Sequence, residues 1–229
     1  MNKTSHVIMN ELNNKFINNF KEWSSSEKME LDKIFIYLKC LAAIGEILQN
    51  NTTLKHRYMC CSIYDEIFSD GVSAIYLAAN AMNKPAKIIL RRIFEMGIAS
   101  IYLWDMPHLA HSWSDHDYDL SFTEMLKHIN SKGYLLYVSV ENNMPLELNI
   151  FPTEECQKIY GVLSDIVHGK VTTFESALPN RFKFTNDEWE KFANQAIQVL
   201  EILIKGYLKR FPISEELYKL VPLSKRELC

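Results

Sequence analysis

The sequence predicts an all-α protein: one domain over residues 1–229, folded as an irregular bundle of about seven helices. Glycine and proline are scarce, with seven of each among 229 residues, whereas strand-rich proteins need many turns and usually contain more of both. Several long segments carry apolar residues at helical spacing. Three Ser/Thr-x-x-Glu patterns, which are typical of helix N-termini, begin at Ser24, Ser121 and Thr185.

The first half of the chain predicts four helices separated by polar or proline-containing breaks. We place them at residues 7–23, 24–49, 54–82 and 85–105. The second helix follows the Ser24 capping box. Gly71 lies inside the third helix and is a weak point, because glycine lowers helix stability. Pro85 suits the first turn of the fourth helix, where its missing N–H is harmless.

The second half predicts three helices, at residues 121–130, 153–168 and 185–211. Thr153 should cap the middle one, and Gly169 follows it where helices often end in a left-handed residue. We expect loops at 108–119 and 171–183, an irregular or briefly extended segment at 131–152, and a short helix or mobile tail from Ser214. The core should lie at about residues 54–211, in the helices at 54–82, 85–104, 153–168 and 186–211.

Charge and hydropathy exclude some functional classes. The formal net charge is −3 and the pI is about 6.2, so nucleic-acid binding would need a local basic patch. The N-terminal segment has no apolar signal core. The uncharged apolar run at residues 96–104 is far shorter than the roughly 18 residues of a membrane span. We therefore expect a cytoplasmic protein that does not bind membranes.

The cysteines favour the same compartment. They are odd in number and form no C-x-x-C pair, which is typical of reduced thiols in the cytosol. The five are Cys40, Cys60, Cys61, Cys156 and Cys229.

The predicted helix at 85–105 carries charges near the centre of an otherwise apolar element. Arg91, Arg92 and Glu95 fall within one sector about 100° wide. Buried charges are costly unless they are paired or face a cleft. Arg91 and Glu95 are four residues apart and can meet on one face. The pattern fits either an ordinary ion pair on a partly exposed stripe or the polar wall of a functional site.

The predicted helix at 153–168 carries a second polar face. Tyr160, Ser164 and His168 are spaced by four and flank an apolar stripe. A histidine in the last helical turn can act as a general acid or base, or as an anion ligand. Ser164 and His168 could instead join neighbouring helices by hydrogen bonds. The candidate catalytic residues are His168, Arg91, Glu95 and Ser164, and the candidate binding residues are Arg92, Tyr160 and Lys170.

Both polar pairs interrupt apolar helices and therefore need partners. We expect Arg91 or Glu95 to lie within hydrogen-bonding or ion-pairing reach of Ser164 or His168, so that the two helices share one site.

We predict that the chain binds no metal and no cofactor. The segment at 108–119 holds residue types that suit zinc, but their spacing matches no familiar ligand pattern. They are His108, His111, Asp115, His116 and Asp117. The sequence also has no Gly-rich phosphate loop, no G-x-S-x-G and no H-E-x-x-H.

The runs ILRRIFEMGIASIYL and YGVLSDIVHGK, in this order, form an R-x-x-x-E helix followed by an S-x-x-x-H-G helix. This pair resembles prokaryotic all-helical proteins at the fringe of the HEPN superfamily (higher eukaryote and prokaryote nucleotide-binding), over roughly residues 54–210. The resemblance implies a helical bundle, often a homodimer, in a toxin–antitoxin, abortive-infection or other phage-defence system. Many members are metal-independent ribonucleases.

The catalytic R-x4–6-H motif of that superfamily is absent from this chain. Gly161, Val162 and Leu163 stand five to seven positions before His168, where the motif would have arginine. Arg91, from the neighbouring helix, is the residue that could replace it.

Two functions follow from these patterns. The first is a binding or regulatory module, in which the polar cluster recognises RNA, a nucleotide or a protein partner, or only locks helices. The second is a metal-independent ribonuclease with His168 as general acid or base on a ribose 2′-OH. Arg91 or Arg92 would then stabilise charge on the phosphate. Glu95 would orient the arginine, and Ser164 would hold the histidine or a phosphate oxygen. The missing motif and the acidic balance favour the module.

Overall fold

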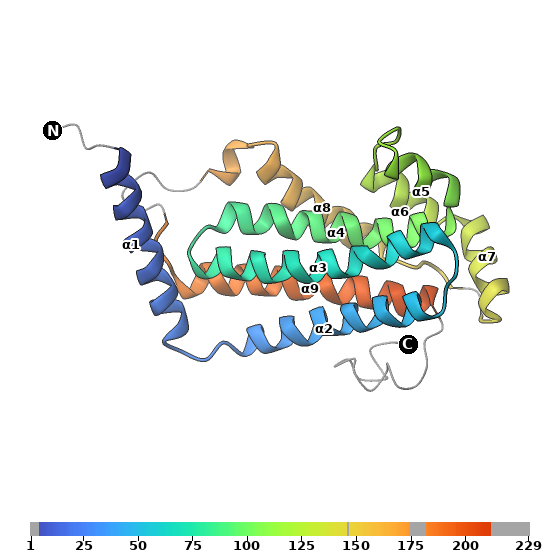
Figure 1. Ribbon diagram of the computed structural model, residues 1–229, viewed down its shortest axis with the longest axis horizontal. Helices are drawn as coiled ribbons and strands as arrows, with labels where there is room; N and C mark the ends of the chain where they lie inside the picture. The colour runs from blue at the N-terminus through green and yellow to red at the C-terminus, as the bar shows by residue number, and fades with distance from the viewer. Residues whose placement is uncertain (1–4, 146, 175–181, 212–229) are drawn as a thin grey trace.

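The computed structural model describes residues 5–145, 147–174 and 182–211, and these residues contain helices and no strand (Figure 1). The helices are α1 Ser5–Ser24, α2 Met29–Asn50, α3 Lys55–Ala79, α4 Asn83–Asp105, α5 Pro107–Ser114, α6 Phe122–Ile129, α7 Lys132–Asn142, α8 Thr153–Val167, the 3₁₀ turn η1 Val171–Thr173 and α9 Asn186–Arg210. The predicted all-α class is confirmed. The expected tail from Ser214 lies outside the described residues.

The described part of the chain contains nine α-helices rather than about seven, because α5 and α7 form where we expected irregular structure. Pro107 begins α5 directly after α4 ends, at a position where proline suits a helix. Ser131 caps α7 by accepting a hydrogen bond from the Tyr134 N–H. The aromatic and β-branched residues of α7 suggested extended backbone, but Tyr134, Leu135 and Val138 are buried at helical spacing.

Two of the three predicted capping boxes are confirmed as helix N-caps. The side chains of Ser121 and Thr185 accept hydrogen bonds from the backbone N–H three residues on. The Ser24 box is wrong, because α1 continues through Ser24 and α2 begins only after Lys28. Thr153 does not cap α8 either, since Pro152 occupies the N-cap position. Gly169 has a φ of +62° and follows α8 as expected.

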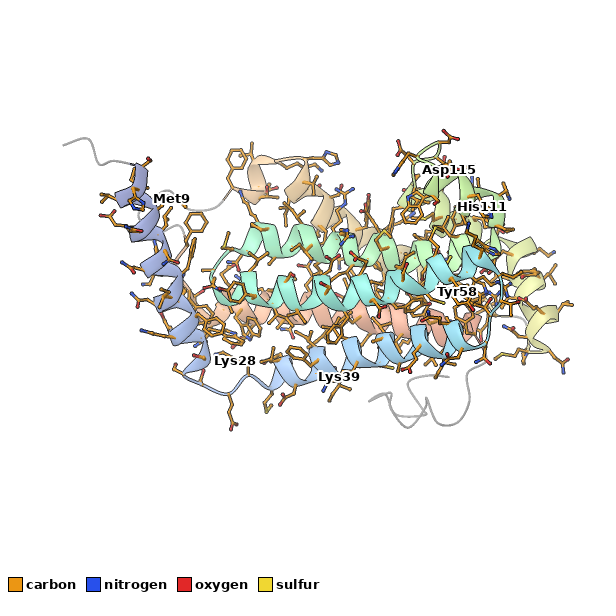
Figure 2. All side chains as sticks on the ribbon, viewed as in Figure 1. Met9, Lys28, Lys39, Tyr58, His111 and Asp115 are labelled. Atoms are coloured by element: carbon orange, nitrogen blue, oxygen red, sulfur yellow. The ribbon has the colours of Figure 1, made fainter. Side chains whose placement is uncertain are left out.

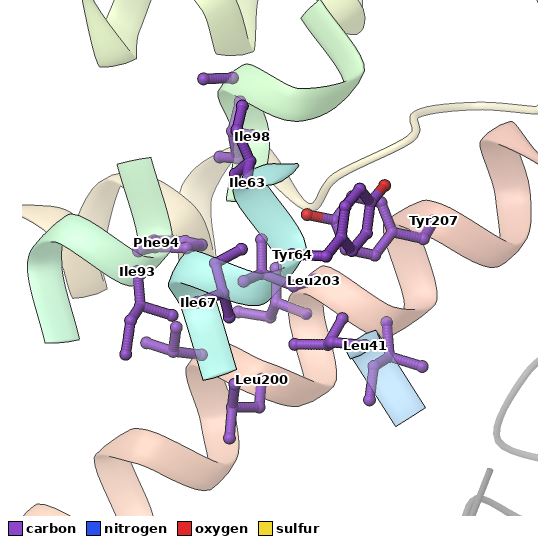
Figure 3. Packing of buried hydrophobic residues seen from close by; sticks show 14 of the residues in the cluster. Leu41, Ile63, Tyr64, Ile67, Ile93, Phe94, Ile98, Leu200, Leu203 and Tyr207 are labelled. Atoms are coloured by element: carbon purple, nitrogen blue, oxygen red, sulfur yellow. The ribbon is translucent and has the colours of Figure 1, made fainter. Parts of the chain in front are cut away.

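Four long helices, α2, α3, α4 and α9, run along the length of the molecule and enclose the core (Figure 1). Figure 3 shows buried side chains from these helices interdigitating, including Phe94, Leu203 and Tyr207. The Tyr207 hydroxyl donates to the Gly97 carbonyl at 2.7 Å and lies 3.0 Å from the Ser100 hydroxyl. These bonds satisfy the buried polar groups where α4 meets α9.

The predicted core is right for α3, α4 and α9 but omits α2. This helix buries an apolar stripe with i, i+3, i+4, i+7 spacing, at Ile34, Tyr37, Leu38, Leu41, Ile44 and Leu48. It packs between α3 and α9. By contrast, α8 lies on the outer side of α4 and buries only Cys156, Ile159 and Leu163.

The cysteines within the described residues are free and buried. Burial raises the pKa of Cys40 to about 11 and that of Cys60 to about 12. These thiols are therefore protonated at neutral pH and act as small apolar core residues. Among the helices that the structure describes, none combines the length and the apolar character needed to cross a membrane.

Candidate functional site

Arg91 and Glu95 of α4 meet a third side chain, Tyr160 of α8, and each of the three bonds to the other two. The Arg91 Nε donates to Glu95 Oε1 at 3.0 Å, and Arg91 Nη2 donates to the Tyr160 hydroxyl at 2.7 Å. The Tyr160 hydroxyl in turn donates to Glu95 Oε1 at 2.9 Å. We call this set of three residues the Arg91 cluster. It joins α4 to α8 through a closed ring of hydrogen bonds.

The Arg91 cluster is partly shielded from water and keeps its charges. The Arg91 and Glu95 side chains are 17% and 32% exposed. Burial lowers the pKa of Arg91, but Glu95 and Tyr160 raise it, and the net shift is upward. Burial and the neighbouring Glu95 carboxylate raise the pKa of Tyr160. The raised pKa values keep Arg91 charged and Tyr160 neutral at neutral pH, and the hydrogen bonds compensate the desolvation of the Arg91–Glu95 pair.

The ring of Tyr160 contacts both Phe122 and Arg91. Phe122, the first residue of α6, stacks on it with centroids 3.9 Å apart and planes 4° apart. The Arg91 guanidinium lies over the ring at 4.9 Å from its centroid, in cation–π geometry. Phe122 is itself buried and packs against Phe94 of α4. The phenol hydroxyl is thus fixed by α4 and α6 together.

Asn130, at the end of α6, sets where α8 begins. Its Oδ1 accepts hydrogen bonds from the backbone N–H groups of Ile150 and Phe151, at 2.9 and 3.1 Å. Its Nδ2 donates to the Phe151 carbonyl and to the Thr153 hydroxyl. The backbone leading into α8 is therefore anchored to α6, which fixes the turn of α8 that faces Arg91.

The expected contact of Arg91 or Glu95 with Ser164 or His168 is not made. No hydrogen bond or ion pair joins these described side chains; the partner from α8 is Tyr160. Ser164 lies one turn beyond Tyr160, about 6 Å along the axis, and His168 lies about 12 Å beyond it. The later turns of α8 face the first turns of α4, so α4 and α8 run in opposite directions. His168 follows the end of α8 and is exposed.

The other two candidate binding residues also lie apart from the Arg91 cluster. Arg92 is rotated about 100° from Arg91 around α4 and pairs with Glu66 of α3 at 3.0 Å, and with Asp70. These ion pairs join α3 to α4. Lys170 is exposed and pairs with Asp165 at 2.5 Å.

The His/Asp-rich segment forms α5 and the turn after it, at the end of the bundle opposite Met9 on α1 (Figure 2). The rings of His111 and His56 are 6.3 Å apart. Among the described residues, no group of three His, Cys, Asp or Glu side chains is arranged to hold a metal ion. The absence of a bound metal therefore stays a prediction that elemental analysis can test.

A groove of about 650 Å³ adjoins the Arg91 cluster, one turn toward the start of α4. Its walls are the first turns of α4, the second half of α8 with Val162 and Ile166, η1 with Phe174, and the backbone before α9. Asn19 of α1 supports this backbone. Its Nδ2 donates to the Asn80 and Phe182 carbonyls at 3.0 and 2.9 Å.

The sequence predicted the Arg91–Glu95 pair but not the residues that position Tyr160 against it or that support the groove beside it. Phe122, Asn130 and Asn19 act through contacts between distant parts of the chain. A capped helix start at Ser121 was the one sequence signal near any of them.

In comparisons with known proteins, no family model, curated protein or solved structure matches the chain. Its function is therefore inferred from its own side chains, above all from the Arg91 cluster and the groove beside it.

Proposed function

We propose that this protein is a binding module without catalytic activity, and that its ligand occupies the groove between α4 and α8. The observation that supports this most is that Arg91 already bonds to other side chains of the protein. Its guanidinium is bonded to Glu95 and Tyr160 and covered by the Tyr160 ring. A cation held in this way joins α8 to α4 and so shapes the groove. Its role is structural and is not to bind a phosphate during a reaction.

A HEPN-like relationship and a role in a phage-defence or toxin–antitoxin assembly belong to the same proposal. They are supported by the all-helical architecture and by the packing of the two motif-bearing helices, α4 and α8, on one another. A protein partner or a second copy of the chain would complete such an assembly. Side chains on α1 that could meet it are exposed, including Met9 at 62%.

The competing function is the metal-independent ribonuclease. One observation favours it: His168 is exposed beside the second half of α8, where a substrate could reach its ring. Against it stands the separation of His168 from Arg91 by about two helical turns of α8. A general acid or base and the cation that stabilises the phosphate must both reach the reacting group.

Two alanine variants should behave differently if the module is correct. His168→Ala should change the free energy of unfolding by less than about 0.5 kcal/mol, because its ring is exposed. Arg91→Ala should lower it by about 1–3 kcal/mol, because Glu95 and Tyr160 lose their partner in a partly buried setting. Thermal melts of both variants test this, since 1 kcal/mol corresponds to roughly 2–4 °C in a chain of this size.

An RNA-cleavage assay on the same proteins separates the two functions. The module predicts that wild type leaves RNA intact. The ribonuclease predicts cleavage that falls about 10²- to 10⁴-fold in a well-folded His168→Ala. That second result would overturn the proposed function.

A further inference from the structure

Three lysines gather around the groove between α4 and α8. Lys84 and Lys87 come from the first turns of α4, and Lys183 comes from the backbone before α9. Lys84 and Lys87 are half-buried. Within the part of the chain that the structure describes, none of the three is ion-paired with a carboxylate. Other lysines of the chain, such as Lys33 and Lys209, do form such pairs.

Like charges that share one groove without counter-charges favour an anionic ligand. Lys84 and Lys87 are half-buried and Lys183 is exposed, and like charges that line one groove repel one another unless an anion lies among them. Glu188 is the one acidic side chain among the described residues that line the groove, and it is already paired with Lys191 at 3.2 Å. The described lining of the groove therefore carries an excess of positive charge, on a chain whose net charge is −3.

The start of α4 adds to this excess. Lys84 lies in its first turn, and the N-cap residue Met82 supplies no side-chain acceptor for the first N–H groups. Such free N–H groups and the positive end of the helix dipole favour anions. Asn83 and Lys84 both line the groove, so this helix end and the lysines border the same space.

The groove also has an aromatic edge. The Phe174 ring is 64% exposed, and Lys84 Nζ lies 5.6 Å from its centroid. Aromatic rings beside cations are surfaces on which planar ring systems stack. The volume of about 650 Å³ is in the usual range for a small-molecule site.

We propose that the groove binds a small ligand that carries at least two phosphate groups, held by Lys84, Lys87 and Lys183. This inference rests on the proposed function and names the chemical class of its ligand. Three cations in one groove match a multiply charged oligophosphate better than a single carboxylate. The small size of the patch favours a compact ligand over RNA, whose binding needs contacts spread along many phosphates. Inorganic polyphosphate and a nucleotide share this chemistry, and Phe174 would stack only on the base of a nucleotide.

Calorimetric titration of the full chain with sodium tripolyphosphate, ATP and adenosine tests the proposal. Wild type should bind tripolyphosphate or ATP. The double variant Lys84→Gln/Lys87→Gln should weaken that binding at least about tenfold, because two charge-assisted contacts are lost. The matched control Lys127→Gln/Lys132→Gln removes the same charge from exposed positions on α6 and α7 and should bind like wild type. Phe174→Leu should weaken ATP binding and spare tripolyphosphate if the ligand is a nucleotide.

Two results would overturn the oligophosphate assignment: no binding of tripolyphosphate or ATP by folded wild type, or equal weakening in the two double variants. A further variant distinguishes a wrong oligophosphate assignment from a wrong binding-module proposal. Val162→Trp places a large ring at a half-exposed position in the groove wall. If adenosine binds wild type, is lost in Val162→Trp and is unaffected in Lys84→Gln/Lys87→Gln, the groove is a ligand site but phosphate is not what it recognises.

Discussion

Replacing Arg210 with leucine should lower the free energy of unfolding by about 3–5 kcal/mol, the cost expected for removing one partner of a buried ion pair. The Arg210 guanidinium donates to both carboxylate oxygens of Asp105, at 2.7 and 2.5 Å, and to Glu141 at 2.8 Å. The Arg210 and Asp105 side chains are only 3% and 1% exposed. Without the arginine, the Asp105 carboxylate stays buried, and its remaining donors among the described residues are the neutral hydroxyls of Tyr134 and Tyr137.

The same helix offers a control with similar chemistry on the surface. Lys191 of α9 pairs with Asp187 and Glu188, but all three are solvent-accessible. Lys191→Leu should leave the melting temperature unchanged within error, because exposed ion pairs add little stability. Thermal melts of the two variants should therefore differ by roughly 6 °C or more. Equal, small shifts would mean that the Arg210–Asp105 pair is not buried.

Gly206→Ala should destabilise the protein by about 1–3 kcal/mol through overpacking. A Cβ at this position of α9 would lie 2.0 Å from Cε1 of Phe151. Phe151 cannot easily move, because its side chain is fully buried and its backbone is bonded to Asn130. The steric cost should exceed the roughly 0.5–1 kcal/mol that alanine gains over glycine within a helix.

Gly161→Ala in α8 is the matched control and should have the opposite sign. Beyond its chain neighbours and the backbone of its own helix, a Cβ there meets no described atom within 4 Å. Only the helix-propensity gain of about 0.5–1 kcal/mol should remain. Denaturant unfolding of both variants measures the contrast. A Gly206→Ala variant as stable as wild type would contradict the close packing of α9 against Phe151.

Local sequence signals predicted much of the fold. The cap at Ser121, the cap at Thr185 and the helix end at Gly169 depend on residues within a few positions, and all three are confirmed. The Ser24 pattern failed because a capping box is only a local preference, and α1 continues through it. Helix α7 was missed because its tyrosines and valines favour strands in isolation, whereas burial of one helical face decides its structure.

The candidate site was less predictable, because its geometry depends on how two helices cross. The i, i+4 spacing of Arg91 and Glu95 predicted their pairing, and that pairing is confirmed. Tyr160, Ser164 and His168 share one face of α8, and no local pattern tells which of them meets Arg91. That choice follows from Asn130 and Phe122, which are held by contacts across 20 or more residues. The lysines of the groove are likewise brought together only by the fold.

Native mass spectrometry of the purified full chain tests the binding module most directly. The account predicts a non-covalent small-molecule adduct on wild type, retained from the cell or formed on adding tripolyphosphate, and lost from a folded Val162→Trp variant. RNA incubated with the same preparation should keep its full mass. Wild type without any adduct, together with RNA cut in a reaction that His168→Ala abolishes, would contradict the binding module and establish the ribonuclease in its place.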